Sequence, residues 1–368
     1  MNDGYIYDIP EYITERALAE TSVKLNPAGS ILIAMYGATI GKVGILTFPA
    51  TTNQACCACI DYSGIEQQYL FYFLLSHKED FIMQGGGGAQ PNISKEKIIE
   101  TLIPIPPRAE QIRIVTAIEK WFHIIDQIER EKTDLENVVK QTKSKILDLA
   151  IHGKLVPQDP NDEPAIELLR RINSDFQPCD NAHYRQLPKN WSICKLSDVC
   201  EFERGITFPA NSKQTYLSRG KIACIRTTNI QEQLETDDLW YIDKSYLKGN
   251  NNKLIRDNDI IMSTANSREL VGKTSYITNL VVPMTFGGFV MALRSKIDHA
   301  QYLFILLRAL FSSGYLSSIA SQTTNIANLS SKTLGDIEIP IPPKSEQGRI
   351  VQAVTDLFGI LDSIIAEL

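Results

Sequence analysis

The strongest constraint on the fold is a phrase that occurs twice. The sequence reads IPIPPRAEQIRIV at 103–115 and IPIPPKSEQGRIV at 339–351, a constant offset of 236 positions. The match continues upstream of the phrase, with small gaps, and pairs Asn92 with Asn328 and Gly41-Lys42 with Gly272-Lys273. A period of this length is far longer than that of a solenoid repeat. It predicts two similar domains, each followed by a similar connector.

Each connector has the pattern of a coiled-coil helix. In the first, a seam with alternating steps of four and three has Lys132 and Thr142 as its two polar positions and apolar residues at Ile114, Ile118, Trp121, Ile125, Ile128, Leu135, Val139, Ile146 and Leu149. The second connector repeats this seam at Ile350, Val354, Leu357, Leu361 and Ile364. Pro106-Pro107 marks the entry of the first helix and Gly153 its end. Matching seams favour two helices that pack antiparallel on each other; the alternative is that each packs on its own domain.

The domains themselves read as α+β. Short apolar segments alternate with turns rich in Asn, Gly, Ser and Thr, and a helix follows in each copy. The predicted boundaries are 1–103 for a first domain, 104–186 for the first connector, 187–338 for the second domain and 339–368 for a shorter second connector.

Composition is that of a globular cytoplasmic protein. Hydrophobic residues make up 43% and charged residues 22%, and no apolar run is long enough to cross a membrane. The CCAC segment has no partner cysteines or histidines at zinc spacing, so we expect reduced thiols and no bound metal. GATIGKVG has Val43 where a P-loop needs Ser or Thr, and the five histidines are scattered. No catalytic motif emerges.

Net charge is −6, which argues mildly against nucleic acid as a partner. The charge is unevenly distributed, however. The stretch Leu187–Glu338 carries a positive balance, whereas the connector Pro104–Asp180 carries a negative one. A basic face on the second domain is therefore compatible with the sequence.

Five phrases together resemble a known family. IPIPPRAEQIRIV, KILDLAIHGKLVPQDPNDEPAIELLRRI, LPKNWSICKLSDVCEFERGITFP, GATIGKVGI and GAQPNIS, taken along the whole chain, are similar to the specificity subunit of type I restriction–modification systems. This resemblance implies two target recognition domains that each read half of a split site in double-stranded DNA, held apart by helical connectors. It also implies a subunit without enzymatic activity, which docks type I methyltransferase (M) and restriction (R) subunits. S-adenosylmethionine, ATP and Mg are then expected on those partners, and no cofactor on this chain.

The sequence departs from the family pattern at its beginning. Met1 aligns near Glu235 of the second copy, so about 48 residues equivalent to Leu187–Leu234 have no counterpart. An alternative function is therefore an interaction rod with only half-site DNA binding, prone to self-association through an incomplete first domain. An independent enzyme is a third hypothesis.

Candidate DNA contacts are polar and basic residues in the turns, because Arg, Asn, Gln, Ser and Thr read base edges and Lys and Arg bind phosphates. The same residue types also favour turns for backbone reasons, and Arg226 could instead form a structural ion pair. In the second domain the candidates are Thr207, Arg226, Thr227, Thr228, Asn229, Ser263, Thr264, Asn266, Arg268, Lys273, Gln322, Thr323, Thr324 and Asn325. In the first domain they are Tyr36, Thr39, Lys42, Gln90 and Asn92.

Overall fold

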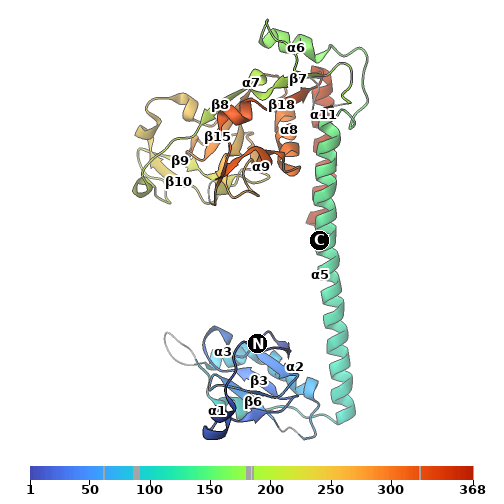
Figure 1. Cartoon of the computed structure of the whole chain (residues 1–368), viewed down its shortest axis with the longest axis vertical. Helices are drawn as coiled ribbons and strands as arrows, with labels where there is room; N and C mark the ends of the chain where they lie inside the picture. The colour runs from blue at the N-terminus through green and yellow to red at the C-terminus, as the bar shows by residue number, and fades with distance from the viewer. Residues whose placement is uncertain (61–62, 86–91, 180–183, 185, 323–324, 368) are drawn as a thin grey trace. The chain divides into compact units, whose positions relative to one another are not determined.

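The chain forms two compact units, Met1–Glu131 (unit 1) and Lys132–Leu368 (unit 2), joined by one continuous helix, α5 (Arg108–Ile151). The computed structural model describes residues 1–60, 63–85, 92–179, 184, 186–322 and 325–367. Figure 1 labels the helices and strands of both units.

Unit 1 is built on a four-stranded sheet in the order β1-β4-β3-β6. β3 pairs antiparallel with β4 and β6, whereas β1 pairs parallel with β4. Every residue of β3 and β4 is buried, which explains why both read as continuous apolar runs. The elements are β1 (Gly4–Ile6), α1 (Glu15–Glu20), β2 (Leu25–Asn26), β3 (Ile31–Ala34), η1 (Gly37–Thr39), β4 (Val43–Leu46), β5 (Ala50–Thr51), β6 (Cys56–Cys59), α2 (Gln67–Ser76), α3 (Lys78–Gln84) and α4 (Lys95–Ile99), followed by the first part of α5.

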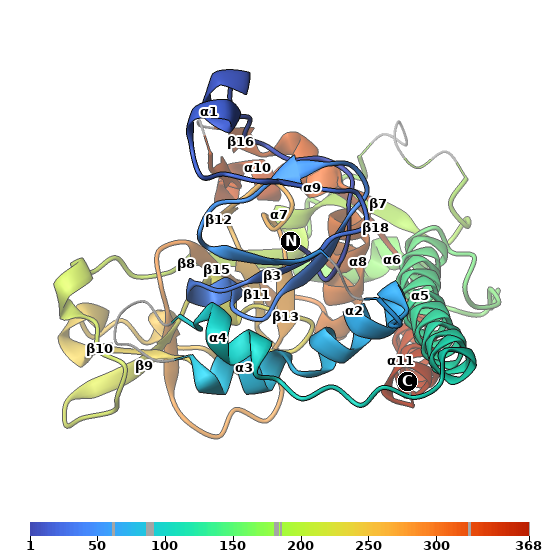
Figure 2. The same ribbon diagram turned by 90° about the horizontal axis from the view of Figure 1, so that it is seen from below.

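Unit 2 contains a larger version of this plan. Its main sheet has the order β13-β11-β15-β8, and β9, β10 and β14 form a second sheet on the side away from α8 and α11 (Figures 1 and 2). The elements after α5 are α6 (Ala165–Ile172), β7 (Ser192–Lys195), α7 (Leu196–Val199), β8 (Cys200–Arg204), η2 (Ala210–Ser212), β9 (Lys221–Ile225), η3 (Thr227–Asn229), β10 (Trp240–Asp243), η4 (Lys244–Leu247), η5 (Asn251–Lys253), β11 (Ile260–Ser263), β12 (Ala265–Asn266), β13 (Thr274–Tyr276), β14 (Met284–Phe286), β15 (Val290–Ser295), α8 (Ala300–Ser312), α9 (Tyr315–Ile319), β16 (Ser321–Gln322), β17 (Ala327–Asn328), α10 (Ser331–Gly335), β18 (Glu338–Ile341) and α11 (Lys344–Ala366).

The sequence repeat is reproduced in individual hydrogen bonds. The hydroxyl of Tyr69 donates to the carbonyl oxygen of Pro104 at 2.8 Å, and Tyr302 donates to Pro340 at the same distance. The side-chain amides of Gln111 and Gln347 donate to Pro106 and Pro342, both at 2.9 Å. The Pro-rich phrase is therefore a structural joint, in which a helix and the start of a connector are bonded together in the same way in each unit.

The sheets of the two units also have hydrogen bonds at equivalent positions. The amide of Gly41 donates to the carbonyl of Ala34 at 3.0 Å, and that of Gly272 donates to Ser263 at 2.8 Å. Both glycines have positive φ, +76° and +88°, a conformation that other residues rarely adopt. The predicted alignment of Gly41-Lys42 with Gly272-Lys273 is thus confirmed at the turn that follows the first central strand.

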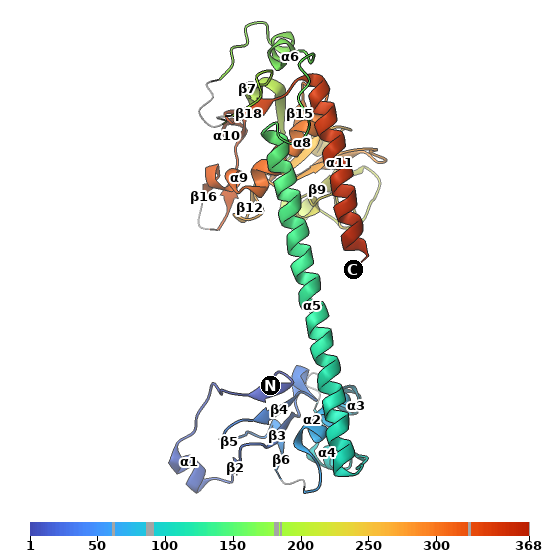
Figure 3. The same cartoon turned by 90° about the vertical axis from the view of Figure 1, so that its right-hand side faces the viewer.

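The connectors run antiparallel within unit 2. Lys143 of α5 forms an ion pair with Asp362 near the end of α11, whereas Gln158, just beyond α5, bonds to Glu346 at the start of α11, each at 2.5 Å. Figure 3 shows the two helices side by side along this stretch. The C-terminal part of α5 and α11 share one core cluster with the second domain, so the predicted connectors are not separate bodies there.

The predicted seam is buried only along part of its length. Val139, Ile146, Ile350 and Val354 are buried, and Leu135, Leu149 and Leu361 are half-buried. Leu357 and Ile364 remain partly exposed, at 37% and 38%. Leu147, Ala150, Ile151 and Phe358 are buried although they lie off the seam. The buried face is wider than two-helix packing predicts because α5 and α11 also join the core of the second domain.

In unit 1 the seam faces solvent. Trp121, Ile125 and Ile128 are 63%, 47% and 59% exposed, and Ile114 and Ile118 are half-buried. Among the described residues of unit 1 they have no antiparallel helix to pack against. Instead Phe122, off the seam, stacks on Tyr72 of α2 with ring centroids 5.8 Å apart. The seam of α5 is therefore buried at Val139 and Ile146 in unit 2 but largely exposed at Trp121, Ile125 and Ile128 in unit 1.

The helix ends agree with the sequence signals. α5 begins directly after Pro106-Pro107 and ends before Gly153, whose φ is +65°. The amide of Lys154 closes the end by donating to Leu149 at 2.9 Å. No helix in the described part of the chain is long and apolar enough to cross a membrane.

Candidate nucleic-acid interface

Two of the predicted DNA-contacting segments in unit 2 are joined by strand pairing. β17 lies between β12 and β16, with Asn266 opposite Ala327 and Ala327 opposite Gln322. This arrangement places the Asn266–Arg268 turn beside the segment that contains Gln322 and Asn325. Thr323 and Thr324 lie outside the described residues.

The third predicted segment, Arg226–Asn229, is followed closely by Gln231, which is held against the same turn. The side chain of Lys273 bonds to the side-chain oxygen of Gln231, and Ser275 Oγ donates to the Gln231 carbonyl at 2.7 Å. Segments that lie far apart in sequence thus converge on one edge of the unit. We name this group, formed by 226–231, 263–273, 321–322 and 325–328, the polar loop cluster.

Within the polar loop cluster, burial separates two kinds of side chain. Thr228, Arg268, Gln322 and Asn325 are exposed, as is Thr207 near the beginning of the domain; Thr227, Asn266 and Lys273 are half-buried. Ser263, Thr264 and Asn229 are only 0%, 6% and 3% exposed.

The buried members are already hydrogen-bonded inside the domain. Thr264 Oγ1 donates to Phe289, and the side-chain amide of Asn229 donates to Asp238, at 3.1 and 3.0 Å. Ser263 Oγ accepts from Asn266 at 3.2 Å. These hydrogen bonds stabilise the conformation of the turns. DNA contact therefore remains a prediction only for the exposed and half-buried residues of the polar loop cluster.

Arg226 has the structural role that the sequence left open as an alternative. Its guanidinium forms an ion pair with Asp238 and lies over the ring of Trp240, with Cζ 4.8 Å from the centroid. Lys213 approaches the same ring, with Nζ 3.9 Å from the centroid. Lys213 and Trp240 were not predicted, because nothing in the sequence near them indicates that β10 passes beside the Arg226 turn.

A group of charged residues ties the polar loop cluster to the helices. The carboxylate of Glu232 accepts hydrogen bonds from Arg308 of α8 at 2.6 Å and from Lys143 of α5 at 3.2 Å. Burial raises the pKa of Glu232, but these two cations outweigh it and hold the pKa below its usual value. Lys143 also pairs with Asp362 of α11. The loop that carries Thr228 is thus anchored directly to α5 and α8, and through Lys143 it is linked to α11.

In unit 1 the predicted residues lie around one turn. Tyr36 pairs with Asn92 as an isolated bridge, and Thr39 Oγ1 donates to the Tyr36 carbonyl at 2.9 Å. Tyr36, Thr39 and Asn92 are exposed and Lys42 is half-buried, whereas Gln90 lies outside the described residues. This group corresponds to the 263–273 and 327–328 part of the polar loop cluster, since Ile93 bonds to Met35 as Leu329, which follows Asn328, bonds to Thr264.

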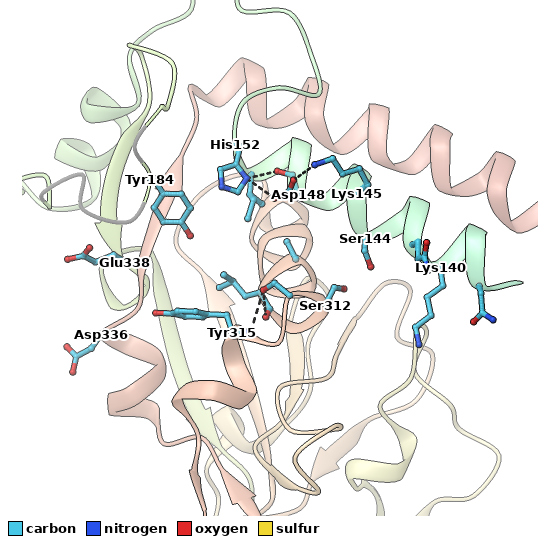
Figure 4. A pocket seen from close by; sticks show the side chains of 16 residues that line it. Lys140, Ser144, Lys145, Asp148, His152, Tyr184, Ser312, Tyr315, Asp336 and Glu338 are labelled. Carbon is cyan, nitrogen blue, oxygen red and sulfur yellow. Dashed lines mark hydrogen bonds and ion pairs between the residues drawn. The ribbon is translucent and has the colours of Figure 1, made fainter. Parts of the chain in front are cut away.

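A pocket in unit 2 is a different site. It measures about 1020 Å³ and lies between α5 and the α8–α9 region (Figure 4). Asp148 accepts from Lys145 at 2.8 Å and pairs with His152 at 3.1 Å; the Lys145 hydrogen bond lowers the pKa of Asp148. Burial raises the pKa of Tyr184 to about 12. The lining mixes both charge signs and includes none of the predicted DNA contacts.

The described residues offer no group of three or more His, Cys, Asp or Glu that could hold a metal. Cys56, Cys57, Cys59, Cys194, Cys200 and Cys224 are free thiols, and burial raises the pKa of Cys56 and Cys59 to about 11. Their thiols are therefore protonated near neutral pH, which makes them poor nucleophiles.

The family is decided by comparison with known domains. The model of the type I restriction modification DNA specificity domain matches residues 2–137 and 188–368, which is most of the chain. The chain belongs to this family. The two matched segments correspond to the two copies of the sequence repeat, the first with the beginning of its connector and the second with the whole of its shorter one.

The named relatives are specificity subunits of type I restriction enzymes. The chain is 26% identical over 258 residues to the MjaIX specificity subunit of Methanocaldococcus jannaschii, covering 68% of this chain and 53% of that protein. It is also 26% identical over 357 residues to the EcoAI specificity subunit of Escherichia coli, covering 78% of this chain and 59% of that protein. The chain thus spans somewhat more than half the length of these relatives.

Solved structures support the fold. A chain from a study of complex assembly and conformational transition of the type I R-M system matches with a TM-score of 0.62 and 18% identity, over 94% of this chain and 77% of that one. The HsdS subunit from Thermoanaerobacter tengcongensis matches with a TM-score of 0.51 and 18% identity, over 92% and 75%. These likenesses confirm the α+β class with paired repeats and helical connectors.

Proposed function

We propose that this chain recognises DNA as the specificity subunit of a type I restriction–modification complex. The observation that carries the proposal is the polar loop cluster, which brings Arg268, Asn266, Gln322 and Asn325 from separate segments to one edge of unit 2. Arginine and the side-chain amides are the groups that read guanine and adenine in the major groove. The role is non-catalytic, in keeping with membership of a DNA specificity family.

The target we propose is bipartite. Unit 1 carries a smaller group of the same kind around Tyr36, Thr39 and Asn92, and α5 links the two units. Two similar readers on one helical connector suit a split, non-palindromic site, in which the separation of the half-sites follows from geometry.

A second candidate is favoured by one observation. In unit 1 the described residues lack any counterpart of β8, β9 and the Arg226–Asn229 turn, so its group of readers is smaller than that of unit 2. Under this alternative, unit 2 reads one half-site and the rest of the chain acts as an interaction rod.

The partners we propose are M and R subunits, which would supply the S-adenosylmethionine, ATP and Mg chemistry. Support for a protein partner comes from unit 1. There Ile118, Trp121, Phe122 and Ile125 of α5, with Tyr72 of α2, line an apolar groove of about 350 Å³. Exposed apolar surface rimmed by polar residues is typical of protein interfaces. We place the complex in the cytoplasm, where unpaired cysteines persist and the DNA is accessible.

The proposal is tested by binding. The chain is co-purified with a type I M subunit, and the complex is selected against random duplex DNA. We expect an enriched motif, part of which is lost in the Arg268→Ala variant and retained in Arg170→Ala. Arg170 is a suitable control because it lies on α6 and is paired with Glu167. Enrichment of no motif would contradict DNA recognition.

A further inference from the structure

A turn beside the polar loop cluster carries an exposed aromatic residue. Gly287, Gly288 and Phe289 connect β14 to β15, and Phe289 is 64% exposed. Phe286 and Val290, on either side of this turn, are both 0% exposed. A single exposed apolar residue is common on protein surfaces, so exposure alone assigns no role to Phe289. What distinguishes this residue is the set of segments to which its turn is bonded.

The backbone of Phe289 is fixed by one of the predicted DNA-contacting segments. Its carbonyl oxygen accepts two hydrogen bonds from Thr264, one from the amide at 2.9 Å and one from the hydroxyl at 3.1 Å. Thr264 belongs to the polar loop cluster and directly precedes Ala265 and Asn266 of β12. Phe289 is therefore held next to the strand that carries Asn266, one of the proposed base-reading side chains.

The same turn contacts two other segments with predicted DNA contacts. The amide of Gly287 donates to the carbonyl oxygen of Ile225 at 2.9 Å, and the Arg226–Asn229 segment follows Ile225 directly. A Cβ atom at Gly288 would lie 3.0 Å from the hydroxyl oxygen of Thr207, so the turn is in close contact with Thr207 as well. The turn therefore lies beside three of the predicted contact segments.

The equivalent position in unit 1 is occupied by an alanine. There the amide of Met35 donates to the carbonyl oxygen of Ala55 at 2.8 Å, as the amide of Thr264 does to Phe289 in unit 2. The strands that follow, β6 and β15, pair with β3 and β11 in the same register. A methyl side chain is thus sufficient at this position of the shared fold. The ring of Phe289 is a feature of unit 2 alone, at the place where its reader segments meet.

An apolar ring complements the polar side chains of the cluster in the major groove. Arginine and side-chain amides bond to the edges of guanine and adenine, whereas the C5-methyl group of thymine is apolar and is contacted by side chains such as Phe. An exposed phenyl ring beside Asn266 and Thr207 has the chemistry for that contact. Because Thr264 already fixes the backbone of Phe289, little backbone entropy is lost when the ring binds.

We propose that Phe289 contacts the methyl group of a thymine in the half-site read by unit 2. This inference rests on the proposed DNA recognition and adds a specificity-determining residue to it. The ring would cover the methyl group and exclude water from it. Uracil differs from thymine only by the missing methyl group, so a uracil at that position would bind less tightly.

The test uses the full-length chain in complex with a type I M subunit and the duplex selected by that complex. Each thymine of the selected motif, on either strand, is replaced in turn by deoxyuridine. We expect one replacement to weaken binding by the wild type about fourfold, the effect of one buried methyl group. The same replacement should have no effect on the Phe289→Ala variant. Phe289→Leu, which keeps an apolar side chain, should retain part of the sensitivity.

A matched control removes another exposed apolar side chain from unit 2. Val281 is 91% exposed and lies beyond β13, which runs antiparallel to β11 and away from the polar loop cluster. Val281→Ala should bind every duplex as the wild type does and should keep the same sensitivity to deoxyuridine.

The outcomes separate this inference from DNA recognition itself. If no deoxyuridine replacement weakens the wild type, or if the weakening persists in Phe289→Ala, the inference is wrong and DNA recognition stands. An equal loss on all duplexes in Phe289→Ala would make the ring a non-specific wedge between base pairs. Loss of the M subunit from the Phe289→Ala complex would make it a protein contact, and either result would overturn the inference. Failure of the wild-type complex to select any motif would contradict the proposed function, and the inference with it.

Discussion

The carboxylate of Glu346 accepts a hydrogen bond from the indole Nε1 of Trp191 at 3.0 Å, with Glu346 only 1% exposed. Gln158 donates to the other carboxylate oxygen at 2.5 Å. Burial raises the pKa of Glu346 above its usual value, although both hydrogen bonds oppose the shift. This glutamate belongs to the repeated IPIPP phrase, and its equivalent Glu110 is exposed. The same phrase therefore sits in two different environments.

The raised pKa gives a pH-dependent prediction. An acid whose pKa rises on folding binds protons more tightly when folded, so its charge destabilises the fold above that pKa, and the loss is recovered as pH falls through it. Glu346→Gln removes the charge and keeps an acceptor for Trp191. We expect its urea midpoint, followed by circular dichroism, to exceed that of the wild type at pH 8. The two midpoints should converge as the pH is lowered. Glu110→Gln should match the wild type throughout, and a lower midpoint for Glu346→Gln at pH 8 would show that the charge is stabilising.

Loss of a reader side chain should affect specific binding. Arg268→Ala removes an exposed guanidinium from the polar loop cluster. If this group makes a bidentate base contact, specific binding should weaken by about 1–3 kcal/mol. Non-specific binding should change little. Competition titrations with the selected duplex and a scrambled duplex measure both, and an equal loss on both duplexes would assign Arg268 to the phosphates.

Lys273 is expected to behave differently from Arg268. Its side chain is half-buried and hydrogen-bonded to Gln231. Because the amine is held at the base of the turn, we expect it to contact a phosphate and not a base edge. Lys273→Ala should weaken binding to all sequences alike and reduce the salt slope by about one. The measurement is the affinity for both duplexes over a range of salt concentrations; a loss confined to the selected duplex would contradict it.

The anchoring of the polar loop cluster can be tested at Lys143. This residue pairs with both Glu232 and Asp362, and its side chain is only 14% exposed. Lys143→Met should speed amide exchange across 226–232 and lower stability by no more than about 1 kcal/mol, because both acidic partners are half exposed. Lys145→Met is the control, since Lys145 is 67% exposed and pairs with Asp148 alone. Equal exchange in the two variants would show that the anchor is not needed.

The connector is expected to determine half-site spacing. Four residues inserted after Glu131 add about one turn, roughly 6 Å, upstream of the stretch that packs on α11. At about 3.4 Å per base pair, the gap in the target should grow by one to two base pairs. Insertion of two residues turns the helix by about half a revolution and should abolish bipartite recognition. Motif selection measures both, and an unchanged gap would contradict the prediction.

Much of the fold follows from local sequence patterns. The repeat, the helix entry at Pro106-Pro107 and the end at Gly153 depend on short-range chemistry, and all three are confirmed. The heptad seam predicted the long helix and its antiparallel packing on α11, but not how the burial of its residues varies along α5. The exposure of Trp121 depends on whether another helix packs beside that part of α5. Such packing is a tertiary property that local sequence patterns do not predict.

The candidate site was harder to predict for the same reason. Residue type alone cannot distinguish Arg268, which is exposed, from Ser263 and Asn229, which are buried and bonded within the domain. The strand pairing that brings Gln322 beside Asn266 is equally non-local. Sequence patterns located the turns, but only the tertiary structure shows which of their side chains are exposed and which are buried.

The central claim is that this chain determines a DNA target sequence, and methylome sequencing tests it most directly. Cells carrying a type I M subunit are compared with and without the chain, and with its Arg268→Ala and Arg170→Ala variants. We predict that a methylated motif is present only with the chain, that Arg268→Ala relaxes one block of that motif, and that Arg170→Ala leaves it intact. A motif that is the same with and without the chain would contradict the account.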